Sequence, residues 1–68
     1  MKIFGKRVKE LREERGISMG ELARHIGTSQ QNVSRWESGE VMPGGDALLK
    51  LSKFFNVSID YLMGLSDE

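Results

Sequence analysis

Only about three residues, beginning at Gly27, separate two segments of this chain that have the pattern of amphipathic helices. Leu22 and Ile26 share one face of the segment before this glycine. Val33, with a tryptophan three residues later, marks one side of the segment after it. A connection this short makes consecutive helices cross steeply, and glycine permits the positive φ that the turn needs. The spacing therefore predicts a helix-turn-helix unit over residues 18–38.

Both helices of this unit have start signals in the sequence. Ser18 is followed three residues later by Glu21, the spacing of a capping box in which each side chain bonds a free backbone N–H group. Thr28 or Ser29 can cap the second helix, and Thr28 with Gln31 repeats the capping-box spacing. The unit therefore has local signals for its boundaries as well as for its faces.

The rest of the chain is also helical in pattern, and no segment shows the alternation of a strand. Phe4, Val8 and Leu11 recur at helical spacing before a stop at Gly16, and Ser58 can cap a short terminal helix. Further helices are expected at 4–16, 46–56 and 59–64. The predicted fold class is all-α, with about five short helices in one domain over residues 1–68.

The composition excludes several classes of protein. Hydrophobic residues make up 38% and charged residues 29%, as in a folded globular domain. There is no cysteine for a disulfide or a thiolate metal site. No Ser/His/Asp trio, histidine-rich ligand set or glycine-rich phosphate loop is present, so we expect no catalysis, cofactor or metal. Without a signal peptide or membrane span, we expect a cytoplasmic protein.

The charge is unevenly distributed although the net charge is zero. Residues 1–16 contain six basic and three acidic side chains, whereas residues 39–68 contain two basic and five acidic ones. The chain can therefore present a basic face formed by its N-terminal part, while its C-terminal part stays acidic.

The helix after Gly27 has two chemically different sides. With Val33 pointing inward, Gln31 and Arg35 fall within about 20° of the opposite direction, and Trp36 lies about 60° from Val33. Gln30 lies at the helix start, where it can project from the tip. Glutamine can pair with adenine N6 and N7, and arginine with guanine O6 and N7, so this face suits the major groove of DNA.

The segments "SMGELARHIGTSQQNVSRWESG" and "LLKLSKFFNVSIDYL" together resemble the phage-repressor/Cro-type (Xre-like) helix-turn-helix family. The resemblance covers about residues 4–65. It implies a compact five-helix, lambda-repressor-like domain whose third helix enters the major groove. It also implies a homodimer on a (pseudo)palindromic double-stranded operator, with half-sites about 34–36 Å apart. The source would be bacterial or phage-encoded.

The resemblance also implies roles for individual residues. Base-reading positions are expected at Gln30, Gln31 and Arg35. Arg12 and Glu37 match a structural ion pair between the first and third helices. Residues expected at DNA backbone or minor contacts, by resemblance or by charge and position, are Ser29, Asn32, Ser34, Arg24, Lys6 and Arg7.

Two positions depart from the family pattern. Met19 stands at the start of the second helix, where relatives often have a polar residue for phosphate. The loop "EVMPGGD" after the third helix contains Glu40 and no lysine or arginine. Each lost phosphate contact reduces affinity and salt dependence, so we expect moderate monomer affinity.

Other interpretations of the same residues remain open at this point. Gln30 and Gln31 are also consistent with ordinary solvated amides, and Arg35 with a surface ion pair to Glu37 or Glu21. A transcriptional repressor is the leading hypothesis. The alternatives are an antitoxin of the same fold and a protein-interaction module with little DNA affinity.

The C-terminal segment "IDYLMGL" is the expected dimer contact, because its large apolar side chains cannot all point into one core. These side chains are Tyr61, Leu62, Met63 and Leu65.

Overall fold

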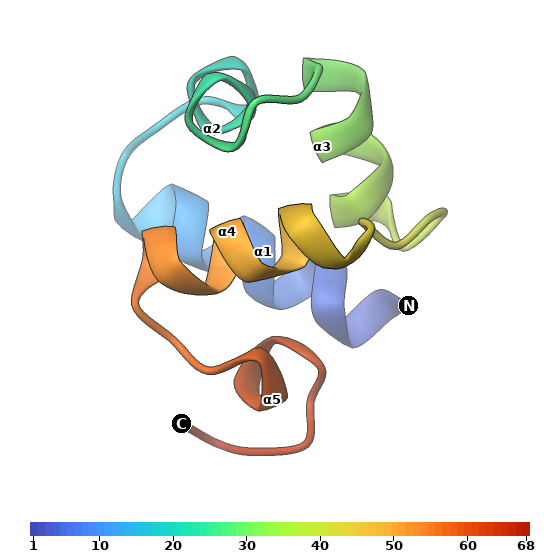
Figure 1. Ribbon diagram of the computed structural model, residues 1–68, viewed down its shortest axis with the longest axis vertical. Coiled ribbons are helices and arrows are strands. Elements are labelled where there is room, and N and C mark those ends of the chain that lie inside the picture. The colour runs from blue at the N-terminus through green and yellow to red at the C-terminus, as the bar shows by residue number, and fades with distance from the viewer.

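Five helices and no strand make up the structure, a computed structural model that describes residues 1–68 (Figure 1). They are α1 (Lys2–Glu14), α2 (Met19–Ile26), α3 (Gln30–Ser38), α4 (Gly45–Phe55) and α5 (Ile59–Leu62). The all-α prediction is confirmed, although α1 begins two residues before the expected Phe4. None of the helices has the length and apolar content needed to cross a bilayer.

The helices surround one apolar core. Figure 1 shows α2 and α3 at one end of the molecule, α1 and α4 across its middle, and α5 at the opposite end. Within this frame α3 packs against both α1 and α2. The core contains residues from all five helices: Phe4, Val8, Leu22, Ala23, Ile26, Val33, Trp36, Leu51, Phe55 and Leu62.

The start of α2 has the predicted capping box. The Ser18 hydroxyl accepts from the Glu21 backbone N–H at 3.1 Å, and the Glu21 carboxylate accepts from the Ser18 N–H at 3.1 Å. At the other end Gly27 has φ 84°, and the Thr28 N–H donates to the Ala23 carbonyl at 2.9 Å. These bonds satisfy free backbone groups at both ends of α2, which fixes where the turn begins.

The start of α3 differs in part from the prediction. Ser29 is the capping residue, and its hydroxyl accepts from the Asn32 N–H at 3.1 Å. The capping box expected between Thr28 and Gln31 is wrong. The Thr28 hydroxyl instead accepts from the Asn32 side-chain amide at 2.9 Å, because Thr28 lies one residue before the cap, outside the helix.

A close approach of two backbones sets the position of α3 on α1. Gly5 is buried in α1, and a Cβ atom there would lie 2.5 Å from the Glu37 carbonyl oxygen and closer still to that of Trp36. Any larger residue would push the C-terminal half of α3 away from α1, so glycine at position 5 helps to orient α3.

Candidate nucleic-acid interface

The two sides of α3 differ as the helical wheel predicts. Val33 and Trp36 are buried, with 0% and 4% of their surface exposed, and both belong to the core. Gln30, Gln31 and Arg35 are all exposed. Because α3 lies at one end of the molecule, its polar side faces solvent rather than another helix (Figure 1).

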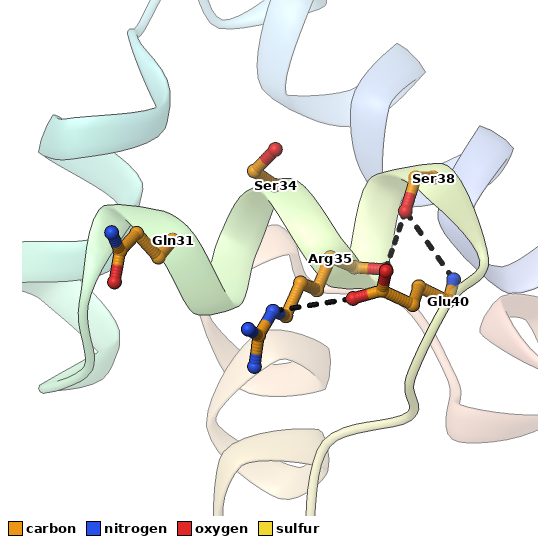
Figure 2. Close-up of a pocket in the computed structure, with 5 residues that line it drawn as sticks. All are labelled: Gln31, Ser34, Arg35, Ser38 and Glu40. Atoms are coloured by element: carbon orange, nitrogen blue, oxygen red, sulfur yellow. Dashed lines mark hydrogen bonds and ion pairs between the residues drawn. The ribbon is translucent and has the colours of Figure 1, made fainter.

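A shallow polar hollow runs along the exposed side of α3. It is lined without any apolar side chain by Gln31, Ser34, Arg35, Ser38 and Glu40 (Figure 2). The first four lie on α3 itself, and the last stands just past its C-terminal end. Amide, hydroxyl, guanidinium and carboxylate groups therefore lie along one open stretch of the α3 surface.

Arg35 has an ion-pair partner within this hollow. Its Nε lies 3.2 Å from Oε2 of Glu40, and the two side chains are 59% and 63% exposed. The sequence pattern left Glu37 and Glu21 open as surface partners, and neither is the partner found. An exposed pair of this kind contributes little stability, about 0–1 kcal/mol, so it does not fix the fold.

The tip of α3 adjoins the first turn of α2. A Cβ atom at Gly20 would lie 3.4 Å from the Gln30 amide oxygen, 3.8 Å from the Ser18 hydroxyl and 4.0 Å from an Arg24 terminal nitrogen. The Gln30 amide and the Arg24 guanidinium therefore both lie close to this glycine, and Arg24 forms no ion pair. Sequence reasoning did not single out Gly20, because its role depends on a side chain from the next helix.

The remaining residues of this face are partly engaged inside the protein. Ser29 and Asn32 are exposed, but the Ser29 hydroxyl caps the helix and the Asn32 amide bonds Thr28. Ser34 is exposed and lines the hollow. Met19 is half-buried against the core, so its side chain packs rather than offers a polar contact.

Arg7 contacts the C-terminal segment of the chain. Its Nη1 donates to the Ser66 carbonyl at 2.8 Å and to the Tyr61 carbonyl, and its guanidinium lies 4.2 Å from the centre of the Tyr61 ring. Tyr61 belongs to α5, which lies at the end of the molecule opposite α2 and α3 (Figure 1). Arg7 thus attaches the C-terminal segment to α1, and its contact with the DNA backbone stays a prediction. Lys6 is exposed and forms no ion pair.

The C-terminal segment, residues 59–65, exposes less apolar surface than its sequence suggested. Leu62 is fully buried, Met63 packs on the core, and Tyr61 lies under Arg7. Only Leu65 is largely exposed, at 78%. Any contact between copies through this segment therefore depends on Leu65 and its surroundings.

The expected pair between Arg12 and Glu37 is present between α1 and α3. Arg12 donates from Nε to Oε2 at 2.7 Å and from Nη2 to Oε1 at 3.0 Å, and its Nη1 donates to the Ile17 carbonyl at 2.9 Å. The side chains are only 11% and 4% exposed. Hydrogen bonding to Glu37 raises the pKa of Arg12 above its ordinary value. The paired side chains link α1 to the end of α3.

This geometry agrees with comparisons to known proteins. A model of a helix-turn-helix family matches residues 8–62. The chain belongs to the helix-turn-helix family. It is 43% identical to the HTH-type transcriptional regulator ImmR of Bacillus subtilis over 90% of its length, and 35% identical to the HTH-type transcriptional activator BcrR of Enterococcus faecalis over 88%. It spans 48% of ImmR and 29% of BcrR.

The fold of this helix-turn-helix domain also matches solved structures. The crystal structure of the P22 c2 repressor protein in complex with synthetic operator 9T superposes with a TM-score of 0.90. The two chains are 33% identical, and the match covers 97% of this chain and 100% of the other. The domain is thus of the lambda-repressor-like kind found in DNA-binding transcriptional regulators.

Proposed function

We propose that residues 1–68 form a single DNA-binding domain of a transcriptional repressor, with the helix-turn-helix motif at 18–38. Its role is to bind a double-stranded operator without catalysis, in the cytoplasm of a bacterium. The observation that carries this proposal is the polar exposed side of α3 on a fold that superposes on an operator-bound repressor. BcrR is an activator, so the repressor assignment follows the structural match rather than the family as a whole.

In this proposal α3 lies in the major groove. Gln31 and Arg35 extend from its exposed side toward base edges (Figure 2). Gln30, the first residue of α3, does so from its tip. Arg24 faces the DNA backbone in this proposal, because its guanidinium lies near the start of α2, close to Gln30 at the tip of α3. Lys6 on α1 adds a weaker phosphate contact, in keeping with the basic N-terminal part of the chain.

A homodimer on a (pseudo)palindromic operator completes the proposal. One small module buries little surface on DNA, and two half-sites about one helical turn apart double the footprint. The C-terminal segment around Leu65 is the proposed contact, because this residue is the most exposed large apolar side chain.

Selection of duplexes from a random pool, followed by titration of variants, tests this function. The wild-type domain should select paired half-sites. Arg35→Ala should lose about 1–3 kcal/mol on the selected duplex and relax one base position, because a bidentate contact to guanine is lost. Gln31→Ala should relax a different position.

Two arginine variants serve as controls. Arg35→Lys keeps the charge without the planar fork, so it should retain non-specific binding and lose the base preference. Arg15→Ala removes the same charge where Arg15 stacks on Phe54, and should leave the base preference unchanged. If Gln31→Ala and Arg35→Ala both select and bind the same duplexes as wild type, the groove assignment is wrong and the protein-interaction alternative gains support.

A further inference from the structure

The Arg35 guanidinium has a defined orientation in the hollow beside α3. Figure 2 shows its Nε turned toward the Glu40 carboxylate, while both terminal nitrogens point away from it. The contact is between Nε and Oε2, at 3.2 Å. Guanidinium is a rigid planar fork with five N–H donors, so engaging Nε leaves the edge formed by Nη1 and Nη2 available. That edge can approach guanine O6 and N7 directly.

Glu40 is held in place by the end of the helix that carries Arg35. The Glu40 N–H donates to the Arg35 carbonyl at 3.0 Å, and also to the Ser38 hydroxyl at 3.3 Å. The Ser38 hydroxyl in turn donates to the Arg35 carbonyl at 3.0 Å, and Gly39 turns the chain with φ 84°. The backbone of Glu40 is thus anchored to the helix end that carries Arg35, which keeps the carboxylate within reach of the guanidinium.

We propose that Glu40 is a positioning residue that sets the base preference of Arg35 and limits binding to other DNA. By accepting from Nε it holds the fork with its terminal edge outward, so less side-chain freedom is lost when that edge meets guanine. Its negative charge also weakens the sequence-independent attraction to phosphates. The residue therefore lowers total affinity and raises the difference between correct and incorrect sites. This inference rests on the proposed function.

Two substitutions at position 40 separate orientation from charge. Glu40→Gln removes the charge and keeps the shape, whereas Glu40→Asp keeps the charge on an arm that is one methylene shorter. Binding is measured by fluorescence anisotropy to four duplexes: the duplex selected by wild type and the three in which the Arg35-dependent base pair is replaced. An unrelated duplex reports non-specific binding. Thermal unfolding confirms that each variant is folded.

Both variants should reduce the preference for the selected base by about two- to fivefold. A change of this size in the dissociation constant is what the loss of one exposed ion pair produces. Glu40→Gln should also bind the unrelated duplex more tightly, and Glu40→Asp should not. In an Arg35→Ala background, Glu40→Gln should change the preference no further, because Glu40 acts through Arg35. If Glu40 acted only on folding, the effect of Glu40→Gln would not depend on whether Arg35 is present.

The inference is overturned if both variants keep the wild-type preference while Arg35→Ala relaxes it. Glu40 would then be only a source of repulsion toward DNA, and the assignment of Arg35 to base reading would stand. If Arg35→Ala itself leaves every base position unchanged, the proposed function fails first, and this inference fails with it.

Discussion

Glu37→Gln tests whether the buried pair between α1 and α3 stabilises the domain as its geometry indicates. The substitution keeps the size of the side chain and removes its charge. It places an amide group against Arg12, whose three donor nitrogens are all engaged and whose side chain is only 11% exposed. One N–H donor of the guanidinium then loses its acceptor in a site that water reaches poorly.

The expected cost is large relative to the total stability. Removing one partner of a buried pair costs about 3–5 kcal/mol, because the other charge is left uncompensated. A chain of 68 residues has a free energy of unfolding of roughly 3–10 kcal/mol. Each kcal/mol changes the Tm of a domain this small by about 4–8 °C, so Glu37→Gln should lower it by about 12 °C or more.

Circular dichroism with urea and thermal unfolding measures both quantities. Glu40→Gln is the matched control, because it breaks the exposed pair with Arg35 and should cost at most about 1 kcal/mol. Replacing Arg12 and Glu37 together by methionine should cost much less than the two single replacements added, since no buried charge remains unpaired. The reasoning is refuted if Glu37→Gln destabilises no more than Glu40→Gln, or if the double replacement is additive.

Two further predictions concern other contacts of α1. Gly5→Ala should destabilise the domain by about 1–3 kcal/mol or prevent folding, because the added Cβ meets the backbone of α3. Gly45→Ala is the control: its Cβ has no neighbour within 4 Å, so it should be neutral in the same urea titration. Arg7→Ala should lower the Tm and leave the salt dependence of DNA binding unchanged, while Lys6→Ala should keep the Tm and reduce the salt slope by about 1. The reverse pattern for Arg7 and Lys6 would contradict a mainly structural role for Arg7.

Local signals were sufficient to predict most of the helices and the two faces of α3. Ser18 and Glu21 are three residues apart, and their capping box forms from nearby backbone alone. The inward side of Val33 and Trp36 follows from helical spacing alone. The sequence left Thr28 and Ser29 open as the cap of α3, because both are adjacent hydroxyl residues, and the structure selects Ser29.

The sequence by itself determined the helix-turn-helix unit, the all-α class and the exposed position of Gln31 and Arg35. These depend on periodicity and on bonds between residues a few positions apart, which the chain carries wherever it folds. The tertiary structure alone decided that Gly5 meets α3 and that Arg7 reaches Tyr61, 54 residues away. No local pattern encodes contacts at such separations, because they depend on how whole helices pack.

The ion pair between Arg35 and Glu40 was predictable neither from helical spacing nor from long-range packing. Glu40 is only five residues away, yet a straight helical wheel does not predict the contact, because the chain turns at Gly39. The left-handed turn brings Glu40 back beside the helix it has just left, and the hydrogen bonds from Ser38 and Glu40 to the Arg35 carbonyl hold it there. The loop that lacks a positive charge in the sequence places, in the structure, a carboxylate beside Arg35.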